Sequence, residues 1–180
     1  MSDGQCRGVK VDPLSTVQIN AVANKFRTTV LDFGTEENID MVDLIENILP
    51  TTFGVNYDIL EKELLGPIEA ATNPDKGELV IREDVYDALN DPNNPMHGRA
   101  RFTLAHELGH LILHEGPALH RQTSVVKHKV FEDSEWQADC FAGEFLMPTA
   151  GCRNLTADQI KERYSVSYTA ARIKFEKLNK

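Results

Sequence analysis

The residues with the clearest capacity for chemistry are two histidines and a glutamate in the pentad His106-Glu107-Leu108-Gly109-His110. Residues four apart on a helix lie on one face, about one turn apart, so the two imidazoles could bind a single metal ion. Glu107 lies one step round the helix, where its carboxylate could reach a water molecule on that ion. The HExxH pattern therefore predicts a metal-dependent hydrolase, with zinc as the default ion, although manganese or another divalent ion could serve.

A catalytic zinc site needs three protein ligands and an open position, and the best candidate for the third ligand is Glu135. Glu135 and Asp139 are four residues apart, in an ExxxD pattern on a predicted helix and opposite to its apolar stripe. Glu132 and Glu115 are competing candidates for the ligand. Asp139 could accept the ring N–H of a ligand histidine and so fix its tautomer.

The expected roles follow from this constellation. His106, His110 and Glu135 would bind the metal, and Glu107 would take a proton from the water and pass it to the leaving amine. His114, one turn beyond His110, fits a structural or outer role, because a helix C-terminus favours a histidine.

The remaining polar candidates carry weaker signals. We expect the other histidines, His97, His120 and His128, to lie in solvated loops, although one of the latter two could cover the cleft. No residue is marked as the group that stabilises an oxyanion, and four candidates cannot be ranked: Tyr57, Tyr86, Arg101 and His128.

The elements that must position these side chains are helices and a few strands. A helix is predicted over residues 14–31, with Asp12 as its N-cap and Pro13 at its first position. A second helix is predicted over residues 40–49, with Pro50 as its end.

Strands are predicted over residues 53–57, 66–72 and 77–82, and the last two are separated by a turn-rich stretch that predicts a hairpin. Residues 78–82 could form an edge strand, to which an extended peptide could add as a further strand. A short helix over residues 84–89 and a loop lead into the pentad helix.

The pentad helix should end near Gly116, and the capping-box pattern Ser134-x-x-Gln137 predicts the start of the ExxxD helix, which Pro148 ends. The fold class is therefore α+β, with a small three-stranded sheet, an HExxH helix, an ExxxD helix and C-terminal helices. We expect one catalytic domain over residues 1–155 and a helical segment over residues 156–180 that packs on it.

Composition limits the class of protein. The chain has 180 residues, enough for one medium domain, and its net charge of −9 argues against general binding of nucleic acid. Three scattered cysteines fit a reducing compartment, and the chain shows neither an apolar signal sequence nor a stretch of about 20 apolar residues. We therefore expect a cytoplasmic protein without a membrane partner.

Two long segments resemble the ImmA/IrrE family of bacterial metallo-endopeptidases. They are Arg101-Phe-Thr-Leu-Ala-His-Glu-Leu-Gly-His-Leu-Ile-Leu-His114 and Glu135-Trp-Gln-Ala-Asp-Cys-Phe-Ala-Gly-Glu-Phe-Leu-Met-Pro148. The resemblance implies a gluzincin-like domain with zinc on His106, His110 and Glu135 and with Glu107 as catalyst. It also implies cleavage of a helix-turn-helix repressor of a prophage, mobile element or stress regulon. The sequence departs from the family at Gln137-Ala-Asp139, where many members have Glu-Ala-Asn.

Two other functions remain open at the level of sequence. The first is a regulatory binding module with a structural metal, in which residues 156–180 form a helix-turn-helix-like tail that touches DNA or a repressor. The tail's excess of basic residues and the break at Ser165-Val-Ser167 favour it, whereas the apolar residues of the tail favour packing on the core. The second is the toxin of a toxin–antitoxin pair.

Overall fold

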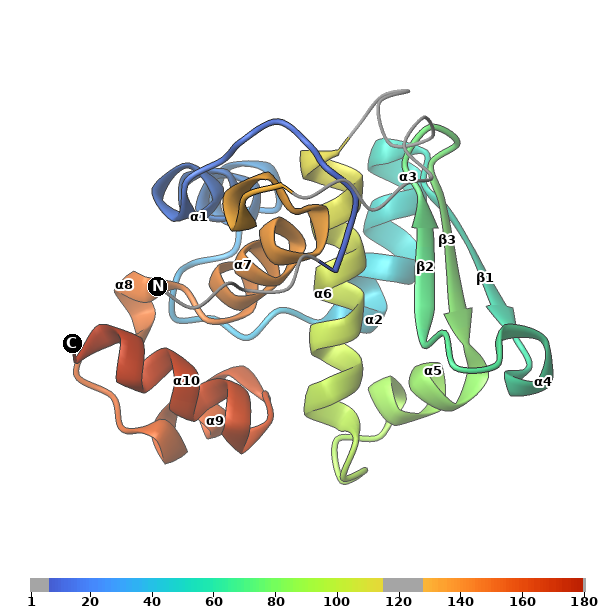
Figure 1. The fold of residues 1–180 in the computed structure, drawn as a ribbon. Helices are drawn as coiled ribbons and strands as arrows, with labels where there is room; N and C mark the ends of the chain where they lie inside the picture. Colours follow the sequence, from blue (N-terminus) through green and yellow to red (C-terminus); the bar gives the residue numbers. More distant parts are fainter. Residues whose placement is uncertain (1–6, 115–127, 180) are drawn as a thin grey trace.

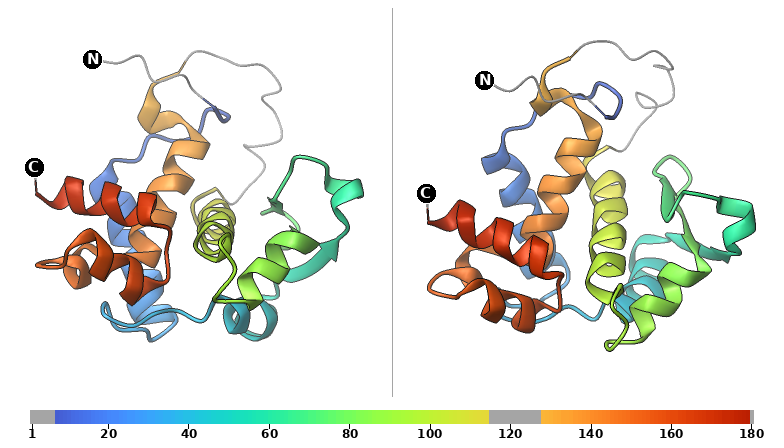
Figure 2. Two further views of the ribbon diagram at one scale, coloured as in Figure 1. Left: turned by 90° about the horizontal axis from the view of Figure 1, so that it is seen from below. Right: turned by 60° about the horizontal axis from the view of Figure 1, so that its bottom comes forward.

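Helix α6 (His97–Leu113), which carries the pentad, runs through the middle of the protein (Figure 1). The structure is a computed structural model that describes residues 7–114 and 128–179. A three-stranded sheet lies on one side of α6, and α1 (Thr16–Lys25) and α7 (Ser134–Leu146) lie on the other, as the two further views also show (Figure 2). The predicted α+β class with a small sheet is confirmed.

The sheet has the order β1-β3-β2, formed by β1 (Asn56–Leu60), β2 (Ala70–Asn73) and β3 (Glu78–Arg82). Strands β2 and β3 form the predicted antiparallel hairpin, and β1 pairs with β3 in parallel. The prediction that residues 78–82 form an edge strand is therefore wrong. Parallel pairing joins segments distant in sequence, so the turn signals that revealed the hairpin could not reveal β1 as the second neighbour of β3.

The first helix begins later than predicted, because Ser15 rather than Asp12 is its N-cap. The Ser15 hydroxyl accepts the backbone N–H of Gln18, and the Gln18 side chain accepts the backbone N–H of Ser15. This reciprocal capping box satisfies two N–H groups at the helix start, which a single cap does not. A π-helical segment, η1 (Phe26–Val30), continues α1.

The second predicted helix does not end at Pro50. It comprises α2 (Met41–Asp43), the π-helical η2 (Leu44–Ile48) and α3 (Leu49–Phe53), and it ends at Gly54 with a left-handed φ of 67°. Pro50 lies in the first turn of α3, directly after the wider π turn. A proline is tolerated there because its missing N–H has no partner to lose.

Helix α7 begins with Asp133 as its N-cap instead of the predicted Ser134. An Asp133 carboxylate oxygen accepts the backbone N–H of Trp136 at 3.0 Å. The predicted caps Thr156 and Ser167 of the last two helices are confirmed. The remaining elements are α4 (Lys62–Leu65), α5 (Glu83–Asn90), η4 (Val130–Glu132), α8 (Thr149–Cys152), α9 (Ala157–Tyr164) and α10 (Tyr168–Leu178).

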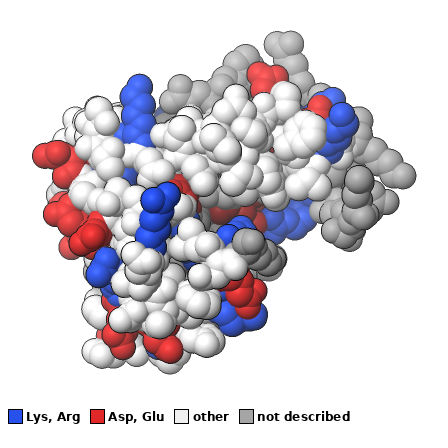
Figure 3. Space-filling view, turned by 90° about the vertical axis from the view of Figure 1, so that its left-hand side faces the viewer, with Lys and Arg blue, Asp and Glu red and all other residues white. Residues whose placement is uncertain are grey.

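The C-terminal helices α9 and α10 place their apolar side chains in the common core, which includes Ile160, Tyr164, Val166 and Ala171. Lys174 of α10 also forms an ion pair with the buried Glu144 of α7, with an N–O distance of 2.6 Å. On the side of the molecule that carries α10, basic and acidic side chains are interspersed (Figure 3). Within the two described stretches, no helix has the length and apolar character needed to cross a bilayer.

Candidate metal centre

Helices α6 and α7 approach closely at Gly109, and this contact brings the candidate ligands together. A Cβ atom at Gly109 would lie 3.1 Å from Ala138 Cα and 3.2 Å from Phe141 Cδ1. His106 and His110 face α7 from one side of this contact, and Glu135 faces them from the first turn of α7. The glycine inside the pentad therefore has a structural reason, because a side chain there would push the two ligand-bearing helices apart.

Three donor atoms converge between the two helices. The Nε2 atoms of His106 and His110 are 3.1 Å apart, and they lie 3.3 Å from different carboxylate oxygens of Glu135, Oε2 for His106 and Oε1 for His110. One ligand atom from each residue lies within 4.8 Å of the other two. A tetrahedral zinc ion with bonds of about 2.0–2.1 Å to nitrogen or oxygen separates its ligand atoms by about 3.3–3.4 Å. The three residues therefore fit a zinc ion. Of the competing candidates, Glu132 instead pairs with Lys10, and Glu115 lies outside the described residues.

Each histidine of the cluster is held through its other ring nitrogen. Asp139 Oδ1 lies 2.9 Å from His106 Nδ1, as the ExxxD spacing predicted, and the second oxygen of Asp139 pairs with the Arg7 guanidinium. His110 Nδ1 lies 3.0 Å from His114 Nδ1. Both rings are thus oriented with Nε2 toward Glu135, the orientation that metal binding requires.

The charges around the cluster favour a positive charge at its centre. A hydrogen bond from His106 is the largest of the contributions that hold the pKa of Glu135 well below its usual range. Burial lowers the pKa of His106, but hydrogen bonds to Asp139 and Glu135 outweigh it and raise that pKa to about 9. A proton or a metal cation would satisfy the same electrostatic preference.

Glu107 lies between α6 and the strand β2, apart from the three donor atoms. Thr72 of β2 donates a hydrogen bond from its hydroxyl to Glu107 Oε2 at 2.9 Å. Burial raises the pKa of Glu107, which makes its carboxylate a stronger base than an exposed one. Thr72 could not be predicted as a partner of Glu107, because a threonine in a short strand has many structural uses.

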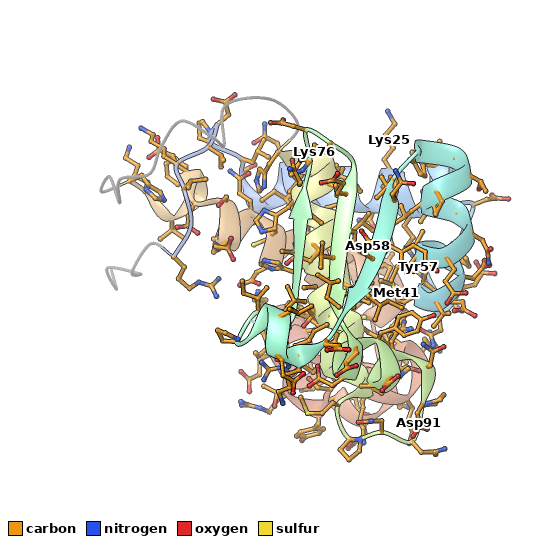
Figure 4. The ribbon with its side chains drawn as sticks, turned by 90° about the vertical axis from the view of Figure 1, so that its right-hand side faces the viewer. Lys25, Met41, Tyr57, Asp58, Lys76 and Asp91 are labelled. Carbon is orange, nitrogen blue, oxygen red and sulfur yellow. The ribbon has the colours of Figure 1, made fainter. Side chains whose placement is uncertain are left out.

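Three of the four candidates for oxyanion stabilisation have other partners or positions in the fold. Arg101 is buried and donates to the Ile39 carbonyl and to Asn38, and Tyr86 bonds to Glu46. Tyr57 is on β1, separated from β2 by the central strand (Figure 4).

The histidines outside the cluster differ from the expectation of solvated loops. The side chain of His128 is 1% exposed and lies 3.1 Å from Asp133, so the prediction of a solvated residue is wrong. His97 is half-buried and its Nδ1 lies 3.0 Å from the Ala88 carbonyl oxygen. His120 lies outside the described residues. The nearby Asp133, five residues further along the chain, was the one signal in the sequence that could have indicated a buried His128.

Part of the chain matches a known protein family. Residues 91–176 match the Peptidase_M78 family, described as the IrrE N-terminal-like domain. Curated proteins give no match. Among solved structures, a Mycobacterium tuberculosis transcriptional regulator matches with a TM-score of 0.54 and 17% sequence identity, over 85% of this chain and 44% of that one. This likeness concerns the fold alone, and the chain spans less than half the length of the regulator.

Proposed function

We propose that the protein is a zinc-dependent endopeptidase with a gluzincin-like site, because residues 91–176 match the Peptidase_M78 family. His106, His110 and Glu135 would hold the zinc ion, and Glu107 would be the catalytic base. The observation that carries the proposal is the convergence of three residues, with the two Nε2 atoms 3.1 Å apart and each 3.3 Å from one of the two Glu135 carboxylate oxygens. These separations match a tetrahedral zinc site.

When bound, a zinc ion would supply Lewis-acid polarisation of the scissile carbonyl and would lower the pKa of a water molecule. Glu107 would accept a proton from the attacking water and later deliver it to the leaving amine. Thr72 holds Oε2 of Glu107, so we assign the proton transfer to Oε1. Asp139 keeps His106 in the tautomer whose Nε2 is free to bind.

The outer edge of β2 is the candidate binding surface for the substrate backbone, in place of the central strand β3. Arg82 N donates to Glu69 O at 3.0 Å, which makes this a hydrogen-bonded pair of the hairpin. Hydrogen-bonded and non-hydrogen-bonded pairs alternate in an antiparallel ladder, so the backbone groups of Ala70 and Thr72 point away from β3. An extended peptide that pairs there would pass next to Glu107.

The proposed substrate is a helix-turn-helix repressor, and the reaction would then take place in the cytoplasm. The family resemblance supports this substrate class, and a role in regulation is compatible with the regulator whose fold is similar. A structural metal site would need a fourth protein ligand. In the described part of the chain, the cluster of candidate ligands contains only His106, His110 and Glu135, which favours the enzyme over the binding module.

The test compares the wild type with Glu107→Gln and Glu135→Ala. A helix-turn-helix repressor from the same genome is co-expressed, its cleavage is followed by mass spectrometry, and zinc content is measured on the purified protein. We expect Glu107→Gln to retain zinc and lose cleavage, and Glu135→Ala to lose zinc. Unchanged cleavage by Glu107→Gln would refute the proposed mechanism. Growth arrest that is relieved by the repressor without its cleavage would instead indicate a toxin.

A further inference from the structure

The second ligand histidine, His110, contacts a histidine on the side away from the cluster. Its Nδ1 lies 3.0 Å from Nδ1 of His114, whose residue exposure is 5%. Two imidazole nitrogens form a hydrogen bond only when one carries a proton and the other presents a lone pair. The direction of this hydrogen bond therefore determines which nitrogen of His110 is protonated.

Gln137 sets that direction. Its side chain is fully buried, and its Nε2 lies 2.8 Å from the Asp12 carbonyl oxygen and 2.9 Å from the Phe131 carbonyl oxygen. Carbonyl oxygens only accept, so both protons of the amide are used and Oε1 faces the other way, 3.1 Å from His114 Nε2. Since Oε1 also only accepts, Nε2 of His114 must carry a proton.

A neutral His114 with its proton on Nε2 has a lone pair on Nδ1. That lone pair accepts the Nδ1 proton of His110, so in a neutral His110 ring the lone pair is on Nε2, which faces Glu135 at 3.3 Å. We propose that His114, fixed by Gln137, is a positioning residue that selects the metal-binding tautomer of His110. This inference rests on the metal site of the proposed function.

The two ligand histidines are thus oriented by chemically different acceptors. His106 uses the carboxylate of Asp139, whereas His110 uses a neutral imidazole. The chain of hydrogen bonds from His110 ends on the backbone carbonyls of residues 12 and 131. Residue 12 lies in the segment before α1, and residue 131 lies in η4 before α7. The N-terminal segment therefore takes part in fixing the ligand.

The test uses a matched pair of variants, His114→Asn and His114→Phe. The Oδ1 of asparagine can replace the lone pair of Nδ1, whereas phenylalanine fills the space without an acceptor. In the metal-free protein, nitrogen NMR of the His110 ring should show the proton on Nδ1 in the wild type and in His114→Asn. In His114→Phe we expect a mixture of tautomers.

Zinc affinity is then measured by competition with a chelator. Loss of a partner of a ligand histidine weakens metal binding about 10–100-fold, and we expect this for His114→Phe but less than about threefold weakening for His114→Asn. Equal affinities of the two variants would overturn the proposal. Gln137→Met is the second variant if His114→Phe does not fold, and an unchanged His110 tautomer in it would also overturn the proposal. A wild type that binds no zinc would refute the metal site itself, while the tautomer measurement would still stand.

Discussion

The substitution Gly109→Ala tests whether the close approach of α6 and α7 determines metal binding. The added Cβ would lie 3.1 Å from Ala138 Cα and 3.3 Å from the Ala138 carbonyl oxygen. Both atoms belong to the backbone of α7, which cannot yield as a flexible side chain can. Overpacking of this kind destabilises a protein by about 1–3 kcal/mol, and the higher helix propensity of alanine offsets about 1 kcal/mol.

The net expectation for Gly109→Ala is a loss of about 0–2 kcal/mol in the free energy of unfolding, which follows from those two terms. The effect on zinc should be larger than the effect on stability. A shift of a few tenths of an ångström between the helices changes the separations of His106 and His110 from Glu135, now 3.3 Å each. We expect zinc affinity to fall at least about tenfold, as for other disturbances of ligand position.

Gly143→Ala is the matched control, because Gly143 lies in α7 and a Cβ there has nothing within 4 Å. It should gain up to about 1 kcal/mol from helix propensity and leave zinc affinity unchanged. The assays are urea unfolding of the metal-free proteins and competition for zinc with a chelator. If Gly109→Ala binds zinc as tightly as Gly143→Ala does, the helix contact does not control the site.

Two further substitutions address the base and the core. Thr72→Val removes the hydrogen bond to Glu107, and a hydrogen bond to a charged group contributes about 1.5–3 kcal/mol. We therefore expect kcat/KM to fall about 10–100-fold while the zinc content stays unchanged. A loss of zinc would contradict this role of Thr72. Glu144→Gln leaves the Lys174 ammonium buried without its partner and should destabilise the fold by about 3–5 kcal/mol at neutral pH. Burial raises the pKa of Glu144, but the charge of Lys174 outweighs it and lowers that pKa, so the stabilisation is complete above the usual glutamate pKa and is lost as pH falls through the lowered value. Urea unfolding should therefore show a smaller acid-induced loss of stability in Glu144→Gln than in the wild type.

The local signals of the sequence predicted most elements of the fold. The predictions of a capping box at Thr156, of a cap at Ser167 and of the hairpin of β2 and β3 are confirmed. Errors arose where two local signals competed. Asp12-Pro13 has the pattern of a helix start, but the helix begins at Ser15, which forms reciprocal hydrogen bonds with Gln18. Pro50 has the pattern of a helix end, but the helix continues past it because a π-helical segment precedes it.

In the candidate site, the residues with helical spacing were predictable from the sequence, whereas the contacts with more distant segments were not. His106, Glu107 and His110 share one helix, and Glu135 and Asp139 share another, so residue types and intervals were enough to predict that His106, His110, Glu135 and Asp139 lie close together. Arg7 and Thr72 reach the site from segments 132 and 35 residues away from their partners, and no periodicity relates such positions.

The contact of His114 with Gln137 lies between these two cases. His114 follows His110 by one helical turn, so its place beside that ring was foreseeable. The partner that determines its proton is on another helix, and the direction of the hydrogen bond becomes apparent only when the backbone carbonyls of residues 12 and 131 are placed around Gln137. Spacing thus specifies which atoms can bind a metal, whereas the tautomer that binds it depends on tertiary contacts made by the N-terminal segment.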